Sequence, residues 1–250
     1  MWSNSVEKVT EVINVADDPW LFRERLSRRL FFSKHLLTGD RDMSSGKFQA
    51  VLLIMVAGFW VWSGIKPHDT CLTWVLETLP VMIALPIILL TYKRFPLTDL
   101  TYTIIAIHAM ILMLGGHYSY AKVPLGFWME DWFGWTRNNY DKIGHLIQGF
   151  GPAIYTREIV VRTSPLKSGK WLGFISIAVP LAFSALYEIF EWLASLSNPT
   201  DTEAFLGTQG YIWDTQSDMF WCLIGSVIAI IMLTKLHNKY LLRIGADCSS

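Results

Sequence analysis

The sequence has little of what marks nucleic-acid-binding proteins and the common soluble enzymes. Its 21 basic and 21 acidic residues give a formal net charge of zero, which argues against a nucleic-acid partner because such partners favour a strong basic excess. The three cysteines form no CxxC pair, so no metal finger or thiol-redox site is expected. No HExxH, Walker or GxSxG sequence is present, and these three common catalytic patterns are therefore excluded.

The first 46 residues also lack the uninterrupted apolar core of a secretory signal peptide. They carry seven Lys and Arg residues, and Asp17-Asp18-Pro19 is a plausible helix start. Apolar residues then recur at roughly helical spacing with basic residues between them. This pattern predicts a basic amphipathic helix on the inner leaflet over residues 1–46. A partly disordered basic leader that only directs membrane topology is the alternative.

Long apolar stretches are abundant in the rest of the chain, which is 52% hydrophobic with 12 tryptophans. About 20 apolar residues cross the hydrocarbon core of a membrane. Six stretches meet this requirement: about 48–65, 72–92, 97–116, 141–161, 171–193 and 213–236. We therefore predict an all-α, polytopic membrane helix bundle with six transmembrane helices in one domain at 47–240, followed by a short cytoplasmic tail at 241–250.

The connections between these stretches alternate between rich and poor in Lys and Arg. The leader, the second and fourth connections and the C-terminal segment are rich, whereas the segment between the fifth and sixth stretches has none. Because Lys and Arg are retained on the cytoplasmic side, both termini are predicted to be cytoplasmic.

Ionisable residues gather at the predicted outer ends of four helices, where charged groups are costly and usually mark function. They are His117, Asp141, His145, Glu188, Glu191, Asp214 and Asp218. Spacings of three or four residues place several of them on one helix face with Gln148, Ser184 or Cys222. Polar faces on neighbouring helices predict an outward-opening polar pocket.

Two chemistries fit such a pocket. His145 with Asp141, Glu188 and Asp218 would make an acid–base group. A divalent metal such as Zn, Mn or Fe is the alternative, with candidate ligands His117, His145, Glu188, Glu191, Asp214 and Asp218. Asp141 and Asp214 also stand where N-cap carboxylates belong. His145, Glu188 and Asp218 are not needed as caps.

Two connections flank the predicted pocket. The aromatic hairpin with Trp128, Trp132 and Trp135 is typical of a membrane-interface segment, and a lid over the pocket is the alternative. The segment before the last helix is expected to shape the mouth of the site, because its glycines permit a tight turn. Its residues are Gly207, Gln209, Gly210 and Trp213.

Several long motifs resemble the YjdF family of bacterial inner-membrane proteins over roughly residues 50–240. Among them are RNNYDKIGHLIQGFGPA, AFSALYEIFEWL and LGTQGYIWDTQSDM. The resemblance implies a multi-pass protein of the inner (plasma) membrane and no particular activity. It also implies an acid where this chain has Tyr211. A fainter likeness to VanZ-like membrane proteins rests on the order and spacing of DKIGH, a Glu and an Asp, and implies action on envelope components at the outer leaflet.

Three functions remain open at this stage, all with membrane lipids as partners and none that names a protein partner. The first is an outward-facing site that binds or modifies a lipid headgroup or envelope precursor. The second is a small proton- or cation-coupled transporter, for which prolines inside the helices would supply discontinuities. The third is a non-catalytic membrane scaffold whose polar residues lock the helices together.

Overall fold

The structure is a computed structural model that describes residues 43–197 and 211–246. Most of the predicted leader and the loop residues Gly207, Gln209 and Gly210 lie outside these ranges. Within the described part of the chain there are seven α-helices, one short 3₁₀ helix and no strand. The predicted all-α class is confirmed.

The helices match the six predicted stretches and add a short one. They are α3 (Met43–Ser63), α4 (Cys71–Thr91), α5 (Asp99–Tyr118), α6 (Pro124–Phe133), α7 (Tyr140–Thr163), α8 (Lys170–Ser197) and α10 (Asp214–Arg243), with the 3₁₀ helix η2 (Tyr120–Lys122) before α6. The chain divides into two units, Met1–Lys47 and Phe48–Ser250. The helices from α4 to α10 belong to the second unit.

Local sequence explains where several of these helices begin and end. Thr70 and Thr98 are the N-caps of α4 and α5, and each hydroxyl accepts a hydrogen bond from the backbone amide three residues later. Pro124 occupies the first turn of α6, and Gly134 ends it in the left-handed conformation. Prolines also lie inside α4, α7 and α8, and all three helices continue through them. The transporter alternative, for which these prolines would supply discontinuities, stays a prediction.

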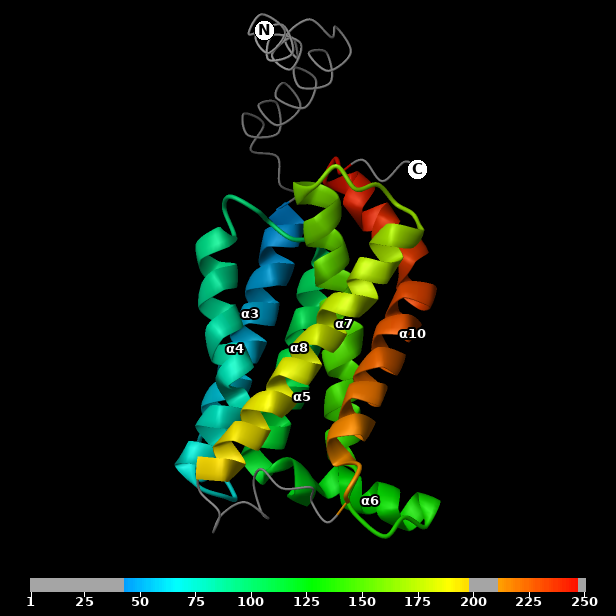
Figure 1. Cartoon of the computed structure of the whole chain (residues 1–250). Coiled ribbons are helices and arrows are strands. Elements are labelled where there is room, and N and C mark those ends of the chain that lie inside the picture. Colours follow the sequence, from blue (N-terminus) through cyan, green and yellow to red (C-terminus); the bar gives the residue numbers. More distant parts are fainter. Residues whose placement is uncertain (1–42, 198–210, 247–250) are drawn as a thin grey trace, which may run out of the picture. The chain divides into compact units, whose positions relative to one another are not determined.

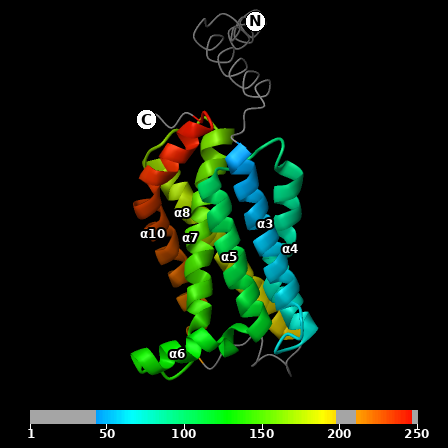
Figure 2. The same ribbon diagram turned by 180° about the vertical axis from the view of Figure 1, so that it is seen from behind.

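Five of the helices, α3, α4, α5, α8 and α10, are long and apolar enough to span a membrane. The sixth long helix, α7, is too polar for that criterion. It packs against α5, α8 and α10 and lies among them in the bundle (Figures 1 and 2). Four of its five charged residues, Asp141, Lys142, Arg157 and Glu158, are buried, and Arg162 is half-buried. Neighbouring helices therefore shield the polar side chains of α7.

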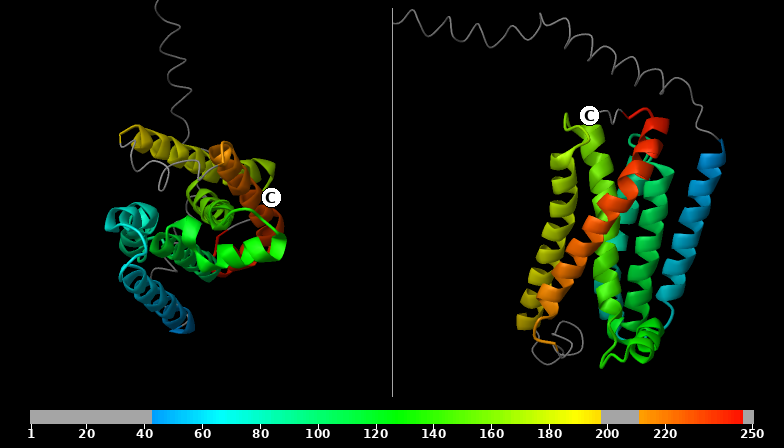
Figure 3. Two further views of the ribbon diagram at one scale, coloured as in Figure 1. Left: turned by 90° about the horizontal axis from the view of Figure 1, so that it is seen from below. Right: turned by 90° about the vertical axis from the view of Figure 1, so that its right-hand side faces the viewer.

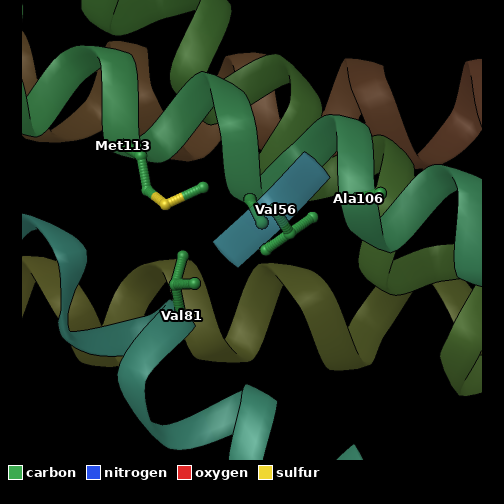
Figure 4. Packing of buried hydrophobic residues seen from close by; sticks show 5 residues of the cluster. Val56, Val81, Ala106 and Met113 are labelled. Atoms are coloured by element: carbon green, nitrogen blue, oxygen red, sulfur yellow. The ribbon is translucent and has the colours of Figure 1, made fainter. Parts of the chain in front are cut away.

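Large apolar side chains cover the outer surfaces of the other helices. Ile54 on α3 and Leu90 on α4 are 70% and 80% exposed, which suits contact with lipid tails. The interior cluster between α3, α4 and α5 consists of small and flexible residues (Figure 4), namely Val56, Val81, Ala106, Ala109 and Met113.

Glycines allow α7 and α10 to cross at close range. A Cβ on Gly149 would collide with the Cys222 carbonyl, and a Cβ on Gly225 would collide with the Leu146 carbonyl. Small residues at such crossings let helix backbones approach. This approach brings the first turns of α7 and α10 together at the end of the bundle where α6 lies across it (Figure 3).

Candidate functional site

A histidine and two carboxylates from three helices form the centre of the candidate site. His145 lies in the second turn of α7, Glu188 in the later part of α8 and Asp218 in the second turn of α10. His145 Nε2 is 3.7 Å from Asp218 Oδ2 and 4.0 Å from Glu188 Oε1. One ligand atom from each residue lies within 4.8 Å of the other two. The structure therefore brings together three of the four residues expected for acid–base chemistry.

This triad is mostly screened from solvent. The side chains of Glu188 and Asp218 are 5% and 7% exposed, and that of His145 is 15% exposed. Glu188 Oε1 is buried with no hydrogen-bond partner among the described residues. Because buried polar oxygens are nearly always paired, this unpaired oxygen beside the His145 imidazole makes Glu188 a candidate metal ligand.

Lys142 organises a second group of acids beside the triad. Its Nζ atom is 2.6 Å from Asp218 Oδ1, 2.8 Å from Asp214 Oδ1 and 3.1 Å from Asp141 Oδ2. The three aspartates have oxygens close enough to hold a metal, but the lysine ammonium already lies among them. The fourth acid–base candidate, Asp141, therefore contacts Lys142 rather than His145. Asp218 belongs to both groups.

A second cation and an aromatic ring border the three aspartates. Arg137 Nη2 is 2.9 Å from Asp214 Oδ1 and 3.8 Å from Asp141 Oδ2. The Tyr211 ring lies 5.0 Å from the Arg137 guanidinium carbon and 5.9 Å from Lys142 Nζ. At the position where the family resemblance implied an acid, this chain thus presents an aromatic face to two cations.

The remaining candidates lie around these groups. Gln148 is half-buried one turn beyond His145 and is within hydrogen-bonding reach of it. Trp213 is exposed directly before α10. Glu191 is half-buried and interacts electrostatically with Glu188 and Asp218, yet it belongs to neither metal-capable group.

His117, expected among the metal ligands, is engaged elsewhere. Its Nδ1 atom is 2.9 Å from the Ser63 carbonyl oxygen, and its ring packs 4.5 Å from Trp62 and 5.3 Å from His68. It joins the ends of α3 and α5 and is in neither metal-capable group.

A buried network of hydrogen bonds and ion pairs lies at the opposite end of α7, and the sequence did not predict it. Glu158 is fully buried. Its carboxylate accepts hydrogen bonds from the Thr98 amide and hydroxyl and from the Thr101 hydroxyl. Arg162 Nη1 lies 2.8 Å away and His237 Nε2 3.1 Å away. The network ties the start of α5 to the ends of α7 and α10.

The sequence contained a signal for two residues, one near each end of α7, that were not predicted as site residues. Lys142 and Glu158 are charged residues inside or at the edge of a predicted transmembrane stretch, and such residues need a partner there. Arg157, near the same end of α7 as Glu158, is 2% exposed and contacts His237 and Asn238.

Comparisons with known proteins agree with the predicted family. The model of a family described as "Predicted membrane protein (DUF2238)" matches residues 48–239. The chain is 48% identical over 185 residues to the protein "Inner membrane protein YjdF" of Escherichia coli (strain K12), a match that covers 74% of this chain and 88% of that protein. No solved structure matches the chain.

These findings confirm the predicted YjdF resemblance and a location in the bacterial inner membrane as a multi-pass protein. The likeness to VanZ-like proteins stays a prediction. With a match over most of its length, the chain belongs to the DUF2238 family of predicted membrane proteins.

Proposed function

We propose that this protein binds a divalent metal at His145, Glu188 and Asp218, and that the site binds or modifies the phosphate-bearing headgroup of a lipid or envelope precursor at the outer membrane surface. The observation that carries the proposal is the convergence of these three side chains from α7, α8 and α10. One imidazole with two carboxylates is a ligand set that suits zinc or manganese. Phosphate oxygens are natural further ligands for such an ion.

The charges around the triad support a bound cation. Four carboxylates (Asp141, Glu188, Asp214 and Asp218) face two basic side chains (Arg137 and Lys142). If all of them are ionised, two negative charges remain uncompensated. Buried charges need partners, and a divalent cation beside Glu188 would balance the cluster.

The proposal includes six spans with both termini in the cytoplasm. At 24 residues, α7 is about 36 Å long, enough to cross a bilayer. Its polarity is compatible with spanning because four of its five charged residues are buried. The exposed aromatics of α6, among them Trp128 and Trp132, suit a membrane interface. Since α6 lies at the same end of the bundle as the site (Figure 1), the site would open close to the headgroups.

Metal binding is tested on purified protein that has been stripped with a chelator and then titrated with Zn²⁺ or Mn²⁺. Wild type should retain stoichiometric metal after desalting. His145→Ala should weaken the affinity by more than about tenfold, because even losing a second-shell partner costs that much. His68→Ala, which changes an exposed histidine in the α3–α4 connection, is the matched control. Equal and negligible metal in all three proteins would refute the metal site.

Orientation is tested through Cys71, which is exposed at the first residue of α4. In intact cells, with the other two cysteines replaced by serine, an impermeant maleimide should label Cys71. A cysteine at Lys93, exposed just after α4 at its other end, should react only after the inner membrane is permeabilised. The reverse pattern would place the site on the cytoplasmic side.

The headgroup part of the proposal is tested by comparing the lipids and envelope precursors of a deletion strain with those of strains complemented by wild type or His145→Ala. A phosphate-bearing species should change in the deletion strain and be restored only by wild type. Identical profiles in all strains would contradict an action on such a species.

A further inference from the structure

A second group of acids lies on α4 and α8, where Glu77 is buried and Glu191 is half-buried. The exposed Lys122 interacts electrostatically with Glu77 but forms no ion pair with it. Glu77 on α4 is 9% exposed, and its Oε2 atom has no hydrogen-bond partner within the described ranges. Glu191 on α8 interacts electrostatically with Glu77 and with Glu188 of the triad. Neither Glu77 nor Glu191 forms an ion pair with a described residue.

Two tyrosines border these acids. Tyr120 and Tyr187 both interact electrostatically with Glu77 and with Glu191. The Tyr120 ring fits between two helices at glycine positions, because a Cβ on Gly115 of α5 would collide with it and one on Gly144 of α7 would come within 2.8 Å. Burial raises the pKa of the Tyr120 phenol well above its ordinary value. Its hydroxyl therefore stays protonated.

Each acid of the second group lies about as far from one end of its helix as His145 lies from the start of α7. Glu77 is six residues from the start of α4 and Glu191 six residues from the end of α8, which is about 9 Å from each helix end. His145 is five residues into α7, or about 7.5 Å. Glu188 and Glu191 are three residues apart on α8, so their Cβ atoms are about 5–6 Å apart. A small ligand at Glu188 is thus within reach of Glu191, which interacts electrostatically with Glu77.

From this arrangement we propose that Glu77 and Glu191, with Tyr120 and Tyr187, bind a primary ammonium group, so that the ligand of the site is a phosphoethanolamine-type headgroup. The inference rests on the proposed phosphate-binding function of the triad and names its ligand class. Carboxylates that form no ion pair with a described residue, together with tyrosine rings, are suited to bind an ammonium ion in a partly dry site. A two-carbon linker between phosphate and ammonium matches the short separation between Glu188 and Glu191.

The test compares two lipids that share a phosphate and differ in the amine. Wild-type protein in detergent is titrated with short-chain phosphatidylethanolamine and with short-chain phosphatidylglycerol, and binding is followed by native mass spectrometry. Phosphatidylethanolamine should bind at least about tenfold tighter, the value of a charge-assisted hydrogen bond. Glu77→Gln and Glu191→Gln should remove this preference and leave phosphatidylglycerol binding and metal content unchanged. Glu130→Gln on α6 is the matched control.

Competition by free ethanolamine and the unfolding temperature of Glu77→Gln distinguish a headgroup site from a free-amine site and from a structural role of Glu77. Free ethanolamine should compete weakly; competition as strong as that of the lipid would make a free amine the ligand and overturn the headgroup assignment. Glu77→Gln should unfold at the same or a higher temperature than wild type, because it replaces a buried carboxylate that forms no ion pair with a described residue. A fall in stability would assign Glu77 a structural role.

The ammonium subsite and the metal and phosphate site are refuted by different results. Equal affinity of wild type for both lipids, with metal still bound, refutes the ammonium subsite alone. Absence of metal and of binding to either lipid refutes the metal and phosphate site on which the subsite depends.

Discussion

Replacing Glu158 with glutamine should destabilise the protein strongly, because this carboxylate is the acceptor of a fully buried network. Its two oxygens face five donors: the Thr98 amide, the hydroxyls of Thr98 and Thr101, a guanidinium nitrogen of Arg162, and His237. Glutamine has the same shape but carries an NH₂ group in place of one oxygen. In either amide orientation, a donor then faces donors.

The expected loss follows from the groups left unpaired. Each buried donor without a partner costs about 1–3 kcal/mol, and breaking a buried ion pair by removing one partner costs about 3–5 kcal/mol. The threonine hydroxyls are able to rotate and accept from the new NH₂ group, whereas Arg162 is not. We therefore expect a loss of about 3 kcal/mol, which for a chain of this size lowers Tm by about 6–12 °C. Thr101→Val, which removes a single hydroxyl, should cost about 1 kcal/mol.

The chain contains its own reporter for this experiment. Cys222 is fully buried, so replacing Cys71 and Cys248 with serine leaves a thiol that becomes accessible on unfolding. Thermal unfolding in detergent is then followed with a thiol-reactive fluorophore. Glu130→Gln is the control for the chemical change alone. A Glu158→Gln protein that unfolds within about 2 °C of its parent, less than the shift expected for 1 kcal/mol, would show that the network contributes little to stability.

Two further changes test the candidate site and the helix crossing beside it. Lys142→Met removes the ammonium group from among the three aspartates, so the variant should bind additional Zn²⁺ or Mn²⁺ when it is titrated with either ion. Unchanged metal content in a folded variant would contradict the inference that Lys142 occupies the place of a metal ion. Gly149→Ala places a methyl group against the Cys222 carbonyl and should cost about 1–3 kcal/mol by overpacking. Gly58→Ala in α3, which has open space around it, should be neutral or stabilising, and equal Tm values for the two alanine variants would refute the close crossing of α7 and α10.

Much of the fold could be predicted because it depends on local properties of the chain. The length of an apolar stretch determines whether it can form a spanning helix, and all six predicted stretches are helices. Spacing of three and four residues places side chains on one face, and Ser184, Glu188, Asp214 and Asp218 are indeed buried. The short helix α6 was expected only as an aromatic hairpin, because ten residues lie below the length that hydropathy detects.

The partners of the charged residues depended on tertiary structure. Periodicity says which face of a helix is polar, but not how each helix is rotated against its neighbours or how far a long side chain reaches. The position of Lys142 among three aspartates could therefore not be predicted. His117 was expected beside His145, but it contacts Ser63. Glu77, one acid in an apolar stretch, gave no sign that it interacts electrostatically with Glu191.

Hydropathy and residue spacing were enough to predict a multi-pass membrane protein of helices with acids and histidines near one end. Hydropathy and helical spacing depend only on residues that are close together in the sequence, so both can be read without knowing how the helices pack. Only the tertiary structure decided which of those residues meet, because the close approach of α7 and α10 at Gly149 and Gly225 brings His145 near Asp218. That contact joins residues 73 positions apart, and no local pattern encodes it.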